Sequence, residues 1–152
     1  MANPLRTKKG FTLVELMIVL MVIGVVAALG TMSSLAARVR ANEGIALNAL
    51  KTVGSGAEMF RNSNNRYPDS LSELGSDYIS PDVATGQKSG YNYELKSGNS
   101  GATFTATASP MSPGRTGVRS FCINLFNVIQ TYDAPNISGD GDQCPTGGGL
   151  LS

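Results

Sequence analysis

Histidine and tryptophan are absent from this 152-residue sequence. Without histidine, the Ser-His-Asp and Cys-His forms of nucleophilic catalysis are excluded, and the commonest zinc ligand is missing. No glycine-rich phosphate loop follows a predicted strand, and no pair of carboxylates is placed by spacing alone. These absences argue against an enzyme and predict no bound cofactor.

Charged side chains are scarce as well, at 15% of the residues. Three of the 12 basic residues lie in residues 1–10, where no acidic residue occurs. The rest of the chain therefore has 9 basic and 11 acidic side chains, a net charge of −2. Because no basic patch is interleaved with aromatic residues, direct nucleic-acid binding is not expected. The length leaves room for one modest domain beyond a membrane segment.

A long apolar run follows the basic start. Residues 11–32 read FTLVELMIVLMVIGVVAALGTM and contain one ionisable side chain, Glu15. About 20 apolar residues, rising roughly 1.5 Å each, cross a bilayer as a helix, and a basic flank stays on the cytoplasmic side. A carboxylate near one end of such a helix is costly unless it meets a positive partner. Glu15 is therefore a candidate functional residue in a predicted single-pass membrane helix.

The junction between the basic start and the apolar run reads KKGFTLVE. It resembles the cleavage and methylation signal of type IV pilins and of the pseudopilins of type II secretion. The resemblance implies that a membrane-bound prepilin peptidase cuts after Gly10 and N-methylates Phe11, the new first residue. It also implies that Glu15 docks subunits into a filament. Many pilins place a helix-loosening proline later in the membrane segment, where this chain has Met32.

Two other interpretations of the same stretch remain open. An ordinary secretory signal could end at the small-residue site of residues 28–30, but the apolar run exceeds the roughly 7–15 residues of a typical signal peptide and contains a charge. A plain membrane anchor explains the length of the run. It does not explain the Gly10–Phe11 junction or Glu15.

The helical pattern continues past the apolar run. Residues 33–62 contain no proline, and their apolar residues recur at gaps of 3, 4 and 7, as on one stripe of a helix. This stripe consists of Leu35, Val39, Ala46, Leu50, Val53, Ala57 and Phe60. The polar face consists of Arg38, Arg40, Glu43, Asn48, Lys51 and Glu58. One continuous helix is predicted, with two separate helices as the alternative.

In the second half of the chain, the spacing of apolar residues changes from a helical to an alternating pattern. Pro68 ends any preceding helix, and a short helical turn is predicted to begin near Asp69 or Ser70. The stretch RYPDSLSEL loosely resembles the αβ-loop that links helix and sheet in pilins. Alternating residues then predict a hairpin over 91–95 and 104–108, a third strand over 121–125 and its extension or a fourth strand over 128–132.

The two cysteines, Cys122 and Cys144, both fall in the C-terminal part. Outside the cytoplasm they can pair, which stabilises by roughly 3 kcal/mol on the chain-entropy model. Two buried free thiols are the alternative, which a cytoplasmic domain would favour. The membrane segment and its basic flank favour the disulfide. In pilins, a similar cysteine pair often bounds a variable surface loop.

The end of the chain, residues 135–152, is polar, glycine-rich and predicted to be irregular. Oxygen side chains occupy alternate positions, at Asn136, Ser138, Asp140 and Asp142. That is part of a calcium loop, but Gly147 replaces the acidic residue expected to close it. Major pseudopilins bind calcium in a C-terminal loop, which makes Asp140 and Asp142 a weak calcium candidate. A solvated turn beside the disulfide is the favoured interpretation.

The predicted fold is therefore α+β and pilin-like. A leader (1–10) precedes a transmembrane and filament-core helix (11–32), whose amphipathic continuation (33–62) packs on an antiparallel sheet of three or four strands. The sheet, the αβ-loop and a disulfide-bounded C-terminal loop form the head (63–152).

The predicted function is structural: a pilin of a type IV pilus-like filament that supports adhesion, motility or DNA uptake. The alternatives are a type II secretion pseudopilin and a membrane-anchored minor pilin that acts as a binding module. The cysteine pair favours the pilus, and the aspartate-proline-tryptophan-glycine stretch typical of major pseudopilins is missing. The expected partners are prepilin peptidase, other copies and related pilins, the inner-membrane assembly platform, and membrane lipid before assembly. The chain would move from the cytoplasmic membrane into an extracellular or periplasmic filament.

Overall fold

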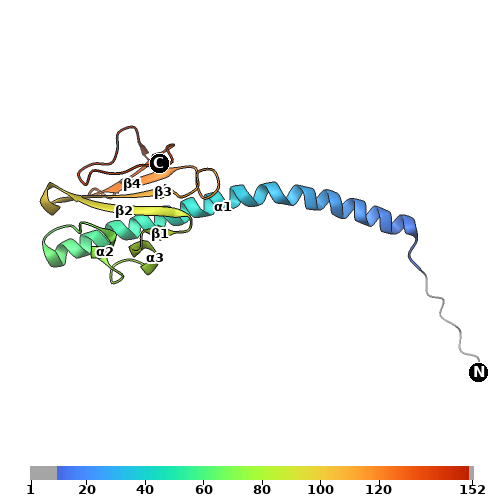
Figure 1. The fold of residues 1–152 in the computed structure, drawn as a ribbon, viewed down its shortest axis with the longest axis horizontal. Helices are drawn as coiled ribbons and strands as arrows, with labels where there is room; N and C mark the ends of the chain where they lie inside the picture. The colour runs from blue at the N-terminus through green and yellow to red at the C-terminus, as the bar shows by residue number, and fades with distance from the viewer. Residues whose placement is uncertain (1–9, 151–152) are drawn as a thin grey trace, which may run out of the picture. The chain divides into compact units, whose positions relative to one another are not determined.

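One long helix begins the fold (Figure 1). The computed structural model of the protein describes residues 10–150, except for the side chains of residues 29–33. Helix α1 extends over Leu13–Asn64 without interruption, which confirms the predicted single helix. The chain divides into two units, Met1–Ala36 and Ala37–Ser152, and α1 contributes residues to both.

Within the part of the chain that the structure describes, no helix combines the length and the apolarity that a membrane span requires. The predicted span, residues 11–32, includes side chains that lie outside this description.

The second unit contains one antiparallel sheet whose strands follow each other in chain order (Figure 1). The strands are β1 (Gln87–Lys88), β2 (Tyr91–Gly98), β3 (Thr103–Pro110), β4 (Ser120–Asn124), β5 (Ile129–Tyr132) and β6 (Gly149–Leu150). The predicted hairpin is confirmed, with Leu95 of β2 opposite Ala106 of β3. Strands β4 and β5 are the predicted third and fourth strands.

The sheet has six strands rather than the predicted three or four, because a two-residue strand is added at each edge. Two residues are too few to show an alternating pattern, so the sequence does not reveal such strands. β1 turns back into β2 through Ser89 and Gly90, which both have positive φ as in a tight hairpin turn. β6 pairs with β5 within the segment that was predicted to be irregular.

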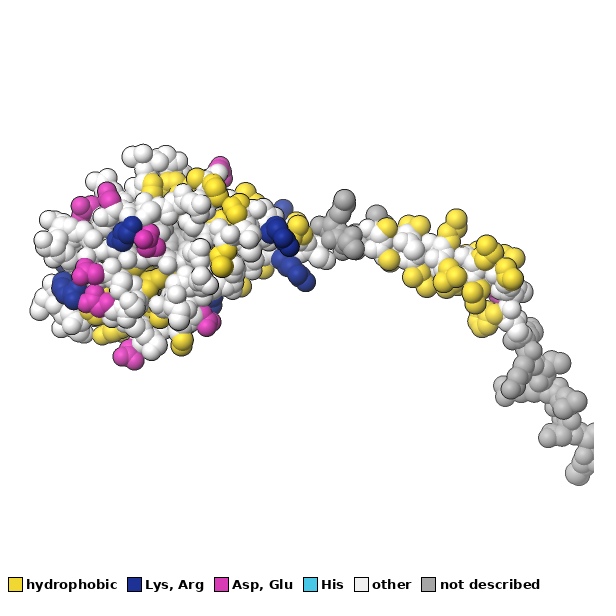
Figure 2. Space-filling view, viewed as in Figure 1, with side chains coloured by type: hydrophobic (Ala, Val, Ile, Leu, Met, Phe, Trp, Pro, Cys, Tyr) yellow, Lys and Arg dark blue, Asp and Glu magenta, His cyan; other side chains and the backbone are white. Residues whose placement is uncertain are grey.

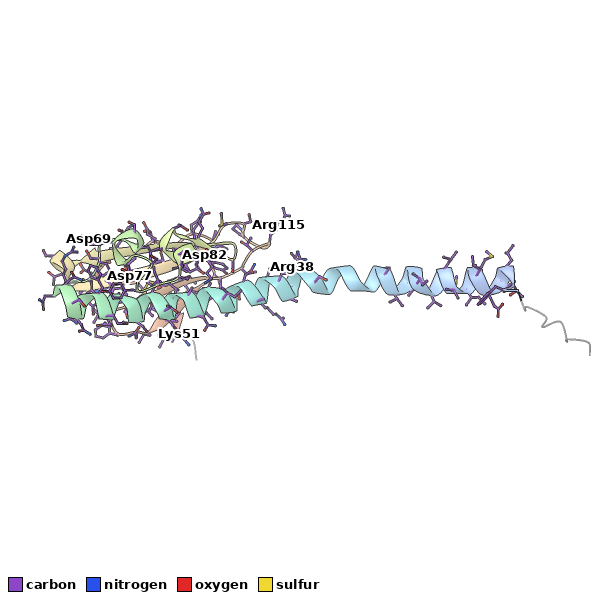
Figure 3. The ribbon with its side chains drawn as sticks, turned by 90° about the horizontal axis from the view of Figure 1, so that it is seen from below. Arg38, Lys51, Asp69, Asp77, Asp82 and Arg115 are labelled. Atoms are coloured by element: carbon purple, nitrogen blue, oxygen red, sulfur yellow. A yellow bond between two sulfur atoms is a disulfide. The ribbon has the colours of Figure 1, made fainter. Side chains whose placement is uncertain are left out.

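One face of the sheet packs against the C-terminal part of α1. Along β2, Tyr91, Tyr93 and Leu95 are buried, whereas Asn92 and Glu94 are exposed, as the alternation predicts. On α1, the buried residues of the same core cluster include Ala46, Leu50, Val53, Ala57 and Phe60. Lys51 lies on the exposed face of α1 and points away from the sheet (Figure 3).

Two glycines of α1 lie where the helix meets its neighbours most closely. A Cβ atom on Gly54 would lie 2.7 Å from Oδ1 of Asn127, and one on Gly56 would lie 3.2 Å from Cβ of Tyr78. Glycine costs roughly 1 kcal/mol relative to alanine within a helix. Close packing against the β4–β5 turn and residue 78 accounts for glycine at these positions despite that cost.

Two short helices connect α1 to the sheet. Helix α2 (Leu71–Leu74) begins after Ser70, as predicted, and Oγ of Ser70 accepts a hydrogen bond from the amide of Glu73 at 3.2 Å. Helix α3 (Pro81–Ala84) was not predicted from the sequence. Its single turn is too short to show a helical period, although proline in the first turn is a start signal.

Candidate functional site

Glu15, the predicted docking residue, lies in the first turn of α1 and forms a capping box with Thr12. Oε2 of Glu15 accepts hydrogen bonds from the amide and from Oγ1 of Thr12, both at 3.0 Å. In return, the amide of Glu15 donates to Oγ1 of Thr12 at 3.2 Å. This reciprocal pair satisfies amide groups that have no partner inside the helix. Glu15 therefore has a local structural role in the single chain.

Thr12 is absent from the sequence-based predictions, although a T-x-x-E pattern before an apolar run is a known capping signal. The box uses only residues 12–15. A chain that begins at Phe11 keeps every atom of it. Capping and the predicted cleavage are therefore compatible.

The residues around the predicted cleavage point are accessible. Phe11 is 87% exposed, and Gly10 and Phe11 both precede the helix. The described residues come no closer than 4 Å to a Cβ atom placed on Gly10. Residues 1–9, the rest of the predicted leader, lie outside the described residues.

The first part of α1 is apolar and exposed all round. Every residue from 11 to 28 is exposed, and Figure 2 shows apolar side chains along this part of the helix. Leu13, Met21 and Val26 have exposed fractions of 76%, 74% and 65%. A helix that is apolar on every side is stable when protein or lipid surrounds it. This segment therefore presents an uncovered apolar surface in the single chain.

A half-buried ion pair lies in the second unit, where Glu43 was predicted to lie on the polar face of the helix. Glu43 is 6% exposed. Its Oε2 accepts hydrogen bonds from Nε and Nη2 of Arg119, at 3.1 and 2.7 Å. Its Oε1 accepts from the amides of Val118 and Arg119, at 3.0 and 3.2 Å. The carboxylate thus fastens the chain before β4 to α1.

The electrostatics of this contact favour the charged carboxylate. Burial by itself would raise the pKa of Glu43, but the hydrogen bonds from Arg119 and from the amide of Val118 outweigh burial and lower it. One sequence signal could have revealed the buried position. Glu43 follows Val39 by four residues and precedes Ala46 by three, so it lies on the apolar stripe itself.

The cysteine pair joins the C-terminal segment to the sheet. A disulfide connects Cys122 on β4 to Cys144, with the Cα atoms 5.9 Å apart. Cys122, Cys144 and Tyr132 form a small buried cluster separate from the main core. The predicted disulfide is therefore present in the structure.

Part of the backbone before Cys144 lies against the sheet. The amide of Ile137 donates to Oγ of Ser109 at 3.2 Å, and the amide of Gly141 donates to Oγ1 of Thr105 at 3.1 Å. Both acceptors are on β3. Thr105 is buried although it points to the face opposite the main core. The oxygen side chains of Asn136, Ser138, Asp140 and Asp142 are exposed, as the favoured interpretation of a solvated turn predicts, whereas Gly139 and Gly141 between them are buried against the sheet.

The calcium candidates serve as hydrogen-bond acceptors within this segment. Oδ1 of Asp140 accepts from the amides of Gln143 and Asp142, at 2.8 and 2.9 Å, and these bonds lower the pKa of Asp140. Oδ1 of Asp142 accepts from Oγ1 of Thr103 at 2.5 Å. Within residues 10–150, no three His, Cys, Asp or Glu side chains are grouped to hold a metal ion. Asp140 therefore has its hydrogen-bond partners within the loop, whereas Asp142 has its partner on β3.

Comparisons with known proteins identify relatives of this chain. Residues 5–31 match the prokaryotic N-terminal methylation motif. The type IV wide pilus major component PilA4 of Thermus thermophilus is 34% identical over 111 residues, which cover 70% of this chain and 85% of that protein. The type II secretion system core protein G of Dickeya chrysanthemi is 28% identical over 116 residues, 74% of this chain and 73% of that protein.

A further relative matches nearly the whole sequence. The type II secretion system core protein G of Aeromonas hydrophila is 27% identical over 135 residues, 84% of this chain and 90% of that protein. These relatives are named as components of a pilus and of secretion systems, and the aligned lengths of 111, 116 and 135 residues extend well beyond the N-terminal motif of residues 5–31. The chain belongs to the family of type IV pilins and type II secretion pseudopilins.

Proposed function

We propose that the chain is a pilin, a structural subunit of a type IV pilus-like filament. Prepilin peptidase cuts after Gly10, the apolar helix holds the subunit in the cytoplasmic membrane, and the assembly platform transfers it into the filament. The observation that carries this proposal is the apolar helix exposed on every side, with Glu15 in its first turn. A relative in the same family is named as the major component of a pilus.

Assembly follows from the chemistry of this helix. In the membrane, lipid covers its apolar side chains, and in the filament the helices of neighbouring copies cover them. Lipid is as apolar as leucine, so close packing and shape favour assembly more than the hydrophobic effect does. A head-to-tail contact that never closes on itself extends into an open fibre.

Glu15 selects the register between neighbours in this mechanism. After cleavage, Phe11 carries a positive amine at the start of the helix. A neighbour displaced along the filament axis offers its amine to this carboxylate. The carboxylate can accept more hydrogen bonds than the two that the amide and the hydroxyl of Thr12 donate to it, since each oxygen has two lone pairs. An unpaired charge in the filament core costs several kcal/mol, so the paired register is strongly favoured.

The test compares three variants that separate charge from capping. Glu15→Gln removes the charge but keeps a side chain that closes a capping box. Glu15→Ala removes both, and Thr12→Ala weakens the box while it keeps the charge. We expect sheared filaments from Thr12→Ala but none from either Glu15 variant, with cleavage after Gly10 confirmed by mass in each strain.

The outcomes are distinct. Normal filament yield from Glu15→Gln together with loss from Glu15→Ala would reduce the role of Glu15 to capping. Normal yield from both Glu15 variants would contradict a docking role altogether.

The second candidate function is that of a pseudopilin, which the extended similarity to core protein G supports. A strain that lacks the chain distinguishes the two. Loss of surface filaments with normal protein secretion supports the pilus, and loss of secretion with unchanged surface filaments supports the pseudopilus.

A further inference from the structure

We propose that neighbouring copies of this chain pack edge to edge, with Phe126 of one copy inserted into a pocket beside α3 and β1 of the next. The proposal rests on the filament assembly proposed above. It specifies which surfaces of the second unit contact each other. These contacts are made by the second unit and not by the apolar helix.

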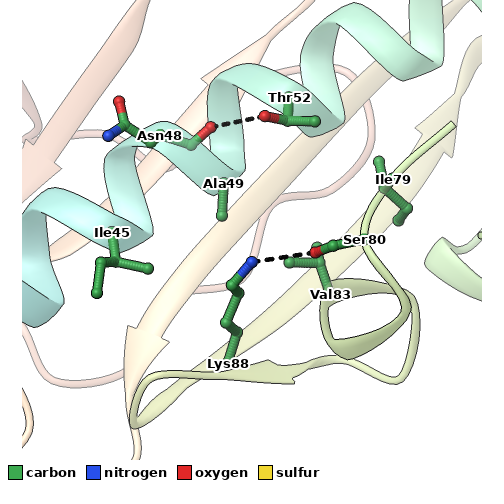
Figure 4. Close-up of a pocket in the computed structure, with 8 residues that line it drawn as sticks. All are labelled: Ile45, Asn48, Ala49, Thr52, Ile79, Ser80, Val83 and Lys88. Carbon is green, nitrogen blue, oxygen red and sulfur yellow. Dashed lines mark hydrogen bonds between the residues drawn. The ribbon is translucent and has the colours of Figure 1, made fainter.

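The pocket lies between α1 and the segment that contains α3 and β1 (Figure 4). Its volume is about 250 Å³. Four apolar side chains line it: Ile45, Ala49, Ile79 and Val83. Lys88 of β1 also lines it, and its Nζ donates to Oγ of Ser80 at 3.1 Å. An enclosed apolar cavity of about 150 Å³ holds benzene, so the volume of this open pocket is sufficient for a phenyl ring.

Phe126 is held outward by a tight turn between β4 and β5. Its ring is 73% exposed. The amide of Phe126 donates to Oδ1 of Asn124 at 3.1 Å, and the amide of Asn127 donates to the carbonyl of Asn124 at 2.9 Å. Asn127 has a φ of 57°, which asparagine tolerates in turns, and its side chain packs where Gly54 leaves space. An aromatic side chain on such an ordered turn loses little entropy on binding.

The pocket and the β4–β5 turn lie toward opposite edges of the sheet. The pocket is formed beside β1, the first edge of the sheet, whereas the β4–β5 turn lies toward the β6 edge. A contact between two different surfaces of identical chains is heterologous, and such a contact extends into an open filament when its rotation does not close a ring. A symmetric dimer would instead bring the same surface together from both copies.

The chemistry of the two surfaces is complementary. The turn carries no charge, since residues 125–128 are Leu, Phe, Asn and Val. Lys88 supplies a cation at the pocket, and an ammonium group near the face of an aromatic ring attracts it. The four apolar side chains of the lining contact the ring, and Asn48, Thr52 and Ser80 complete the wall of the pocket. A second copy of this chain therefore provides what the pocket can bind.

The test is cross-linking in assembled filaments. Ile45→Cys and Phe126→Cys are introduced together, because Ile45 lines the pocket and both side chains are exposed. On non-reducing gels, we expect sheared filaments of the double variant to give a ladder of dimers and larger species. Each single variant should give monomer, and peptide mapping should recover the native Cys122–Cys144 pair.

A matched control places the second cysteine at another exposed apolar residue instead of Phe126. Met111 is 47% exposed and lies outside the β4–β5 turn, so the pair Ile45→Cys and Met111→Cys should give no ladder. Filaments of the Ile45–Phe126 double variant that contain only monomer overturn the proposal and leave the pilin function intact. Absence of filaments from the unmodified chain contradicts the proposed function itself.

A truncation gives an independent readout if the double variant assembles poorly. Phe126→Ala should lower the yield of sheared filaments about tenfold, as expected for loss of an interface hot spot, whereas Met111→Ala should leave it unchanged. Equal yields from the Phe126→Ala variant and the unmodified chain overturn the proposal.

Discussion

Glu43 shows how one carboxylate can secure a contact between segments far apart in the sequence. Its two oxygens accept four hydrogen bonds from residues 118 and 119. The hydroxyl of Tyr91 donates to the carbonyl of Arg119 at 2.9 Å, which adds a second tie at the same place. A buried carboxylate without such partners would be protonated or would destabilise the fold.

The first prediction at the residue scale concerns Glu43→Gln. At pH 7 we expect the free energy of unfolding to fall by about 2 kcal/mol, less than the roughly 3–5 kcal/mol of a fully buried pair. The value is smaller because the Arg119 side chain is 40% exposed. Urea denaturation of the purified chain measures it. As a control, Glu94→Gln should cost about 0.5 kcal/mol or less, because its pair with Lys96 is exposed.

The effect of Glu43 also depends on pH in a definite direction. Its pKa is lower in the folded than in the unfolded chain, so its stabilising effect is complete above the usual glutamate pKa of about 4.3. The effect is lost as the pH falls through the lowered folded-state pKa. The difference between wild type and Glu43→Gln should therefore narrow below pH 4. A difference that stays constant down to pH 2 would contradict the assignment.

At the scale of elements, the C-terminal segment acts as the second cover of the sheet. α1 covers one face through an apolar stripe, whereas residues 137–142 cover the other through hydrogen bonds to β3. The disulfide joins the end of this segment, at Cys144, to β4, at Cys122, across a sequence separation of 22 residues. A hydrogen bond between neutral groups contributes about 0.5–1.5 kcal/mol, so the covalent bond is expected to contribute most.

The prediction at this scale is that Cys122→Ser combined with Cys144→Ser lowers the free energy of unfolding by about 2–5 kcal/mol. The double replacement avoids a single reactive thiol. Thermal and urea unfolding measure the loss, and non-reducing peptide mapping confirms the pair in the parent chain. Quantitative alkylation of both cysteines in the native, unreduced protein would contradict the disulfide.

At the scale of the whole molecule, the chain divides its tasks between two units. The first presents apolar side chains on every side of a helix, and the second has its own core. The first unit therefore needs other molecules around it, while the second can bury its apolar residues by itself. This division is what a subunit needs if it is to exist both in a membrane and in a fibre.

The prediction for the whole molecule concerns maturation. The mass of the intact membrane or filament form should match a chain that begins at Phe11 and carries one additional methyl group. A methylated amine keeps its positive charge, so the proposed contact with Glu15 is preserved. A mature chain that begins at Thr31 would instead indicate an ordinary secretory signal and would contradict the pilin function.

The sequence by itself determined the parts whose signal is local or periodic. Apolar residues at helical spacing predicted α1, and alternation predicted β2 to β5, because burial on one face imposes a period on the side chains. The candidate residues Gly10, Phe11 and Glu15 follow from a contiguous motif. A calcium loop at Asp140 and Asp142 was a weaker inference, because the sequence lacks the acidic residue expected to complete the site.

Only the tertiary structure decided the features that depend on segments meeting in space. β1 and β6 exist because the chain returns beside β2 and β5, and two residues carry no pattern. Glu43 became a buried residue because Arg119, 76 positions away, supplies its counter-charge. The C-terminal segment became a cover for the sheet because β3 offers hydroxyl groups in register with it. Composition could not reveal these contacts, because each depends on which distant partner the folded chain brings within hydrogen-bonding distance.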